Sequence, residues 1–269
     1  MAEITLPRSE FIIDSHAHVM EEYFKGEQQS VIARAFASGV TQFVNPGCTL
    51  EAIPELIGLA DSHENIFIAV GVHPHEAKDW TDLSAGTVRQ FAGHKKVVAI
   101  GECGLDFYYN HSDEPSQVRA LTEQIHLALE FDKPIIIHCR DAWDKVFKLL
   151  EDEGKGKLRG VFHCFTGGPE LLPRIAQLDF YVSFSGIVTY PNAKNIQEAA
   201  AIASKHRILV ETDCPYLAPQ KVRGKRNEPA YVWFVAEKLA QLRGETLSEV
   251  ARVCCENTRE LFRLPMPAP

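Results

Sequence analysis

Short apolar runs recur along the chain, and longer segments of mixed apolar and polar residues separate them. Most of these runs are continuously apolar rather than alternating, which is typical of strands that are buried on both faces of a sheet. We interpret each run, with the polar residues that end it, as a β-strand and its exit. Eight runs are found, at residues 11–18, 42–47, 66–75, 97–107, 134–140, 160–165, 180–186 and 208–217.

Between and after these runs, apolar residues recur at spacings of three and four, which indicates amphipathic helices. A strand followed by a helix, repeated over 269 residues, predicts an α/β fold in which residues 1–269 form a single (β/α)8 TIM barrel domain. An open doubly wound sheet is the alternative, and it is disfavoured because no GxGxxG motif follows the first run. The helical segments are residues 28–39, 51–63, 115–131, 142–154, 170–178, 193–206, 228–244 and 246–262.

Composition narrows the class of protein. The formal charge of −8 argues against a general nucleic-acid coat, although bound divalent cations could still supply positive charge at a local site. No apolar stretch reaches the roughly 20 residues needed to span a bilayer, and the first ten residues do not resemble a signal peptide. The seven cysteines form no CxxC pair, which favours free thiols in a reducing compartment. We expect a cytoplasmic monomer without a membrane partner.

Two histidines end the first run. Residues i and i+2 of a strand lie on the same face, so His16 and His18 should project together. In a barrel, such groups at the C-terminal ends of the strands form the active site. A chelating pair for a divalent metal is therefore expected, and a hydrogen-bonded pair of histidines without a metal is the alternative.

Chemically similar residues end four more runs, and this convergence is stronger than any single spacing. Six ligands on five strands are too many for one open site and suit two divalent ions, with zinc, magnesium or manganese as candidates. We assign His16, His18 and Asp213 to one ion and His138 and His163 to the other, with Glu102 bridging the two. A water activated by both metals would be the nucleophile, and Asp213 could accept its proton.

Other residues near the strand ends are candidates for contacting a substrate. His73 follows the third run and could bind the substrate or simply stabilise its loop. Arg140 could contact an anionic substrate or form a salt bridge. Loops after the last strands of a barrel often bind phosphate, so the basic segment 221–229 is a phosphate-binding candidate, with a solvated loop as the alternative. Its proposed contact residues are Arg223, Lys225 and Arg226.

Three further carboxylates could support the ligands. Asp106 could orient a ligand or cap its loop. Asp14 and Glu211 each precede a proposed ligand by two positions, so each could share its face and hydrogen-bond it.

Between residues 12 and 229 the chain contains, in this order, the motifs IDSHAH, GVHPH, GECGLDF, IIIHCRDA, FHCFTG, ETDCPYLAP and RGKRNEP. In these motifs and in their order, the sequence resembles the TatD-related metal-dependent deoxyribonucleases. The resemblance implies an amidohydrolase-like TIM barrel with a two-metal site, the same six ligands, and His73 as a substrate contact.

The resemblance also implies a function. It predicts hydrolysis of DNA phosphodiesters from the 3′ end, so the expected partner is a nucleic acid. A deacylase acting on D-aminoacyl-tRNA or another ester is an alternative, because both substrates present a nucleic-acid 3′ end to the metals. A metal-stabilised binding or scaffold protein without turnover is an alternative of another class. It is disfavoured because structural metal sites are closed and usually four-coordinate.

Overall fold

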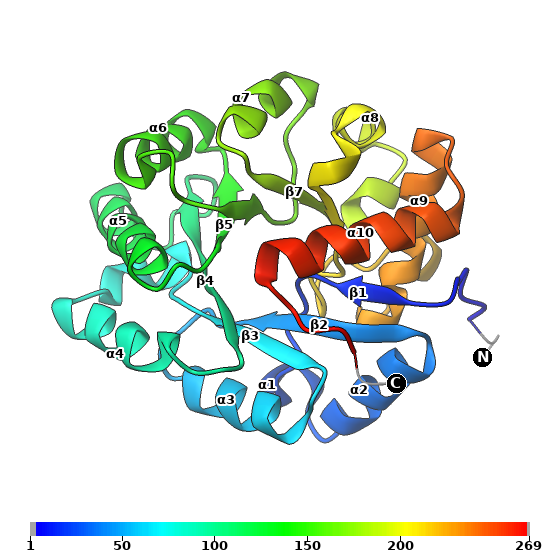
Figure 1. Ribbon diagram of the computed structural model, residues 1–269, viewed down its shortest axis with the longest axis horizontal. Helices are drawn as coiled ribbons and strands as arrows, with labels where there is room; N and C mark the ends of the chain where they lie inside the picture. Colours follow the sequence, from blue (N-terminus) through cyan, green and yellow to red (C-terminus); the bar gives the residue numbers. More distant parts are fainter. Residues whose placement is uncertain (1–3, 268–269) are drawn as a thin grey trace.

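The computed structural model describes residues 4–267 and contains one parallel sheet whose eight strands follow each other in chain order (Figure 1). Backbone hydrogen bonds bring the last strand beside the first, because Ser15 N donates to Val210 O at 3.1 Å and Asp213 N donates to His16 O at 2.9 Å. The predicted (β/α)8 barrel is thereby confirmed. The strands are β1 Ile12–Asp14, β2 Val40–Pro46, β3 Ile66–Val70, β4 Val97–Asp106, β5 Ile135–Arg140, β6 Gly160–Phe162, β7 Tyr181–Phe184 and β8 Ile208–Val210.

Helices surround the barrel on its outside (Figure 1). They are α1 Glu21–Phe24, α2 Gln28–Ala37, α3 Ile53–Ser62, α4 Asp82–Ala92, α5 Glu114–Glu130, α6 Trp143–Gly154, α7 Leu172–Gln177, α8 Lys194–Ile202, α9 Val232–Arg243 and α10 Leu247–Phe262. The pattern of apolar residues did not predict α4. Its buried positions are Ser84, Val88 and Ala92, which are small or polar and leave little apolar periodicity to detect.

Alternate residues of the strands build two apolar layers. Side chains such as Ile12 and Phe43 pack outward against the helices, whereas Ile13 and Val44 fill the barrel. Phe262 of α10 belongs to the inner cluster, so α10 covers the end of the barrel where the strands begin (Figure 1). The opposite end, which the loops after the strands surround, is called the mouth below. None of the described helices is long and apolar enough to cross a membrane.

One glycine allows β4 and β5 to approach closely at the mouth. Gly104 has a φ of +152°, and a Cβ at this position would lie inside the contact distance of the His138 carbonyl oxygen. The two strands pair in register, with Gly104 opposite His138. This close approach places the side chain of Glu102 beside that of His138.

Candidate active site

The carboxylate of Glu102 lies at the centre of the polar residues at the mouth. It is buried, and its two oxygens face different groups of histidines. Three rings surround Oε1: His73 Nε2 lies 3.2 Å away, His138 Nδ1 lies 3.2 Å away and His163 Nε2 lies 2.9 Å away. These residues come from the ends of β3, β5 and β6, as the sequence predicts.

The second oxygen of Glu102 faces the first strand. Oε2 lies 3.2 Å from His16 Nε2 and 3.6 Å from His18 Nε2. The two Nε2 atoms lie 3.1 Å apart, and Asp213 Oδ1 lies 3.6 Å from that of His16 and 3.5 Å from that of His18. Glu102 therefore reaches both groups with different oxygens, which is the arrangement required of a bridging ligand.

The donor atoms fit divalent cations. Within residues 4–267, the groups whose ligand atoms lie within 4.8 Å of one another include His16–His18–Asp213, His16–Glu102–His163 and His73–Glu102–His138. The Nε2 of His163 is buried and has no well-aligned hydrogen bond within residues 4–267, although it lies 2.9 Å from Glu102 Oε1. Imidazole and carboxylate donors suit zinc and manganese, and carboxylates also suit magnesium. His138 and His163 meet the same oxygen of Glu102 but belong to different groups, so their sharing of one ion stays a prediction.

The surroundings hold the carboxylates ionised. Burial alone would raise the pKa of Glu102, but His163 and His73 and the other rings lower it well below its usual range. Burial likewise opposes ionisation of Asp213, yet the hydrogen bond with His18 leaves its pKa lowered. Burial lowers the pKa of His73 to about 4 against the attraction of Glu102, so this ring is neutral near pH 7.

Asp106 fulfils both of the roles considered for it. Its Oδ2 lies 3.0 Å from His138 Nε2 and 3.0 Å from His75 Nε2. Its Oδ1 accepts hydrogen bonds from the backbone N–H groups of Tyr108 and Tyr109, at 3.0 and 2.9 Å. One carboxylate therefore orients a candidate ligand and also fixes the loop after β4.

The other two supporting carboxylates differ in what they contact. Glu211 Oε1 lies 3.3 Å from His163 Nδ1 and accepts a hydrogen bond from Cys164 N at 2.7 Å, so Glu211 orients the His163 ring. Within residues 4–267, Asp14 forms no hydrogen bond or ion pair with a histidine ring. It accepts hydrogen bonds from the backbone and hydroxyl of Thr212, at 2.9 and 2.5 Å, and thereby ties β1 to the residues after β8.

Arg140 extends over aromatic rings at the mouth. Its guanidinium lies 4.0 Å from the ring centroid of Tyr108 and 4.7 Å from that of Tyr109. Among the described residues, no carboxylate lies within salt-bridge distance of it, so the salt-bridge alternative is not supported. Its positive charge remains available to an anionic substrate.

The basic segment contains both paired and unpaired cations. Arg223 lies over the ring of Tyr190 at 4.6 Å, and neither it nor Lys225 forms a salt bridge within residues 4–267. Arg226 instead pairs with Glu27. Its role as a phosphate contact stays a prediction, and the pair with Glu27 would have to open.

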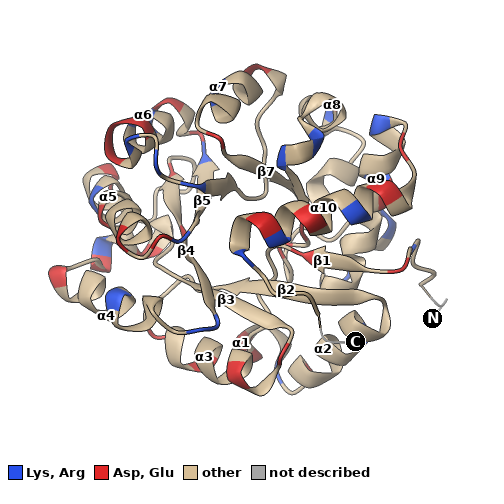
Figure 2. Ribbon diagram, in the orientation of Figure 1, with Lys and Arg blue, Asp and Glu red and all other residues tan. Residues whose placement is uncertain are grey.

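Charges of both signs are spread over the outer helices (Figure 2). In this view, which looks onto the end covered by α10, Lys and Arg do not gather into one basic face. At this end of the barrel the picture therefore agrees with the net charge of −8, which argues against a general nucleic-acid coat.

The six candidate ligands around Glu102 are called the centre, or the Glu102 centre, below. Sequence reasoning overlooked two features beside this centre. Cys48 Sγ lies 4.0 Å from His18 Nδ1 and 3.9 Å from Glu102 Oε2. Tyr23 and Tyr216 lie edge-on to the ring of His18, with centroids 6.0 and 6.3 Å away. Cys48 follows the second run, and its place at a strand end is the signal that could have identified it.

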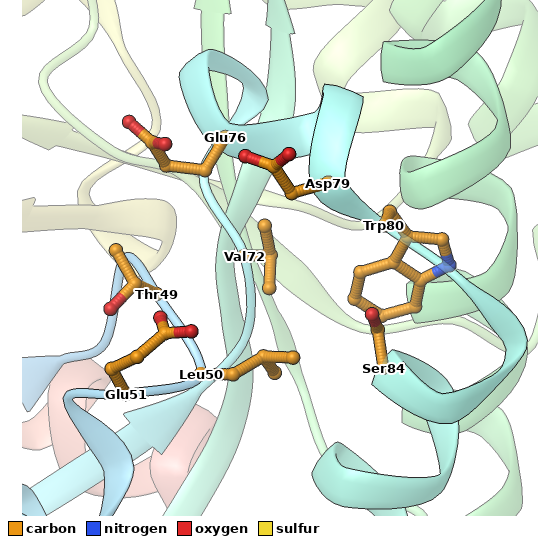
Figure 3. A pocket seen from close by; sticks show the side chains of 8 residues that line it. All are labelled: Thr49, Leu50, Glu51, Val72, Glu76, Asp79, Trp80 and Ser84. Carbon is orange, nitrogen blue, oxygen red and sulfur yellow. The ribbon is translucent and has the colours of Figure 1, made fainter.

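A separate pocket of about 150 Å³ is lined by residues that follow β2 and β3 (Figure 3). It is formed where the loop after β2 faces the 3₁₀ helix η1 Pro74–Asp79, and Trp80 closes one side. None of the six candidate ligands lines it. The pocket is therefore distinct from the candidate active site.

Comparisons with known proteins agree with this geometry. The family model described as TatD related DNase matches residues 13–263. An uncharacterized metal-dependent hydrolase from Bacillus subtilis, YabD, is 40% identical over 253 residues, which cover 94% of this chain and 99% of YabD. The 3′-5′ ssDNA/RNA exonuclease TatD of Cronobacter sakazakii is 35% identical, over 93% of this chain and 97% of its own. The crystal structure of YjjV, a TatD homolog from Escherichia coli K12, superimposes with a TM-score of 0.86 at 30% identity, over 94% and 98% of the two chains.

Proposed function

Because the chain belongs to the TatD related DNase family, we propose that this metal-dependent hydrolase is a DNase that removes nucleotides from the 3′ end of DNA. The observation that carries the proposal is Glu102, whose two oxygens face two groups of histidines. A relative named as a 3′-5′ ssDNA/RNA exonuclease supports the substrate.

The six residues would hold two divalent ions as the sequence predicts. His16, His18 and Asp213 would bind one ion, His138 and His163 would bind the other, and Glu102 would bridge them. When bound, the ions would polarise the phosphodiester and lower the pKa of a water.

The chain's own groups would then position the substrate and move protons. Asp213 is ionised and its side chain is 12% exposed, so its carboxylate can accept a proton from a water at the mouth. His75 N donates to His73 Nδ1 at 3.2 Å, which places the proton of the neutral His73 ring on Nε2. This N–H points into the centre and would hydrogen-bond a phosphoryl oxygen, while Arg140 and Arg223 would bind neighbouring phosphates.

A single pair of assays tests the reaction. Metal-loaded protein is incubated with 5′-labelled single-stranded DNA and, in parallel, with D-aminoacyl-tRNA. Stepwise shortening of the DNA is expected from the wild-type protein and should be lost with Glu102→Gln. The exposed Glu130→Gln on α5 is the matched control and should shorten the DNA normally.

The other outcomes discriminate between the alternatives. Release of the amino acid without shortening of the DNA would move the assignment to ester hydrolysis at the same centre. Failure of both substrates would contradict the proposed substrates, and a Glu102→Gln protein that also fails to fold would favour a binding or scaffold protein.

A further inference from the structure

Few large apolar side chains are exposed among residues 4–267, and tyrosines at the mouth are prominent among them. Tyr108 is 59% exposed and Tyr109 is 51% exposed, and both directly follow β4. Tyr216, which follows β8, is also 51% exposed. Exposed aromatic groups that gather beside a polar centre point to a ligand with flat apolar faces.

Tyr108 and Arg140 form a stack that is open on one side. The guanidinium lies 4.0 Å from the Tyr108 ring centroid. The neighbouring Tyr109 ring is inclined at 88° to the Tyr108 ring, and the two ring centroids are 4.9 Å apart. Within residues 4–267, the Tyr108 ring contacts one other ring, that of Tyr109, and one cation, Arg140. Tyr109 is further supported by His111, whose ring is parallel to it at 5.6 Å. Tyr108 is therefore the more accessible of the two rings.

The position of this stack relative to the centre is fixed by Asp106. One oxygen of Asp106 accepts hydrogen bonds from the backbone of Tyr108 and Tyr109, and the other contacts His138. The same carboxylate holds both the loop after β4, which carries Tyr108, and the candidate ligand His138. A group stacked on Tyr108 would therefore keep a defined place beside the reacting phosphodiester.

We propose that Tyr108, supported by Arg140 and Tyr109, stacks a nucleobase of a single-stranded nucleic acid whose phosphodiester lies at the Glu102 centre. This inference rests on the proposed function and names how its substrate is held. Every base has a π-face, so stacking tolerates any sequence, whereas a base inside a duplex is already stacked on its neighbours. The N–H groups of Arg140, which form no salt bridge within residues 4–267, would hydrogen-bond a phosphate next to the stacked base.

Binding to intact and abasic oligonucleotides tests the stack directly. The probe is a short, labelled single strand with cleavage-resistant phosphorothioate linkages, with and without bases at its 3′ end, followed by fluorescence anisotropy on metal-loaded protein. The wild-type protein should prefer the intact strand. Tyr108→Ala should weaken its binding roughly 5- to 100-fold, and should change binding of the abasic strand little. Tyr108→Phe should restore the preference because the ring is retained.

Two controls separate stacking from general effects. Ile202→Ala removes an exposed apolar side chain from α8, away from the mouth, and should leave both affinities unchanged. In a cleavage assay, Tyr108→Ala should raise KM and preserve kcat, because the stack binds substrate and transition state alike.

The result can also contradict the inference. Equal affinity of the wild-type protein for intact and abasic strands would overturn it, and so would a loss of preference with Tyr216→Ala but not with Tyr108→Ala. Base-dependent binding that Tyr108→Ala abolishes, without any cleavage of DNA by the wild-type protein, would support the stack while refuting only the proposed exonuclease reaction.

Discussion

The Asp106 carboxylate holds the His138 ring from the side opposite the centre, with Oδ2 3.0 Å from Nε2. His138 Nδ1 then faces Glu102. We expect Asp106→Asn to lower metal affinity or activity about 10- to 100-fold, because the amide holds the ring less firmly and lowers its basicity. Metal titration and cleavage rates measure the effect. Asp61→Asn is the matched control, since Asp61 faces His94 at 3.5 Å far from the candidate ligands, and it should change neither.

Removal of divalent metals should abolish hydrolysis and lower thermal stability. The ligands converge in the folded chain, so an ion binds the native state preferentially. At a concentration 100-fold above Kd, one ion stabilises the protein by about 2.7 kcal/mol, or a Tm increase of roughly 5–10 °C for a domain of this size. Thermal unfolding after chelation and after return of zinc, manganese or magnesium measures this. If return of the metal raised the Tm of the Glu102→Gln protein by the same amount, the ions would have to bind elsewhere.

Replacement of unpaired cations in the basic segment should reduce the salt dependence of DNA binding. Arg223 and Lys225 lack salt bridges within the described residues, so each can contact a phosphate. Each Ala substitution should lower the slope of log K against log salt by about 0.7 for single strands. Arg226→Ala should change the slope less, because Arg226 pairs with Glu27. Lys221, paired with Glu237 at 2.8 Å, provides a control in the same segment. Unchanged slopes for Arg223 and Lys225 would exclude the segment as a phosphate contact.

Gly104→Ala should destabilise the protein by about 2 kcal/mol or more, because a Cβ there collides with the backbone of His138 and φ is +152°. Gly58→Ala on α3 is the matched substitution. Nothing lies within 4 Å of its Cβ, so it should be stabilising by about 0.5–1 kcal/mol. Chemical denaturation of both variants measures the contrast, and equal midpoints would contradict the close approach of β4 and β5.

The capping box at the start of α10 should make a pH-dependent contribution to stability. Thr246 Oγ1 accepts from Glu249 N at 3.2 Å, and Thr246 N donates to Glu249 Oε2 at 2.9 Å. Thr246→Ala should lower Tm by roughly 2–4 °C at pH 7. Hydrogen bonds from Thr246 lower the pKa of Glu249, so its contribution is complete above the unfolded pKa of about 4.3 and is lost as the pH falls through the folded pKa.

The Tm values of the wild-type protein and of Thr246→Ala should therefore converge as the pH is lowered towards 3. Thr87→Ala, a half-buried threonine within α4, provides a control for removal of a hydroxyl without a cap. A difference that stays constant with pH would show that Glu249 does not contribute through its charge.

Much of the fold and of the candidate site followed from local patterns. Continuous apolar runs between amphipathic segments predicted the barrel, and parallel strands bring all their C-terminal ends to one edge. That geometry groups His16, Glu102, His138 and Asp213 at the mouth from the sequence alone. The pattern failed at α4, where Ser84 and Ala92 occupy buried positions and carry no apolar signal.

The tertiary structure alone decided how these residues meet. Three contacts join residues from different parts of the chain. They are the approach of each Glu102 oxygen to its own set of rings, the pairing of Arg226 with Glu27, and the stack of Arg140 on Tyr108. Such contacts depend on strand register and side-chain packing, which no local pattern encodes. The sequence by itself therefore determined which residues reach the mouth, because the succession of strands along the chain and the residues at their C-terminal ends follow from local patterns. Their partners depended on the closed barrel, because only closure brings the ends of β1, β4 and β8 within hydrogen-bonding distance.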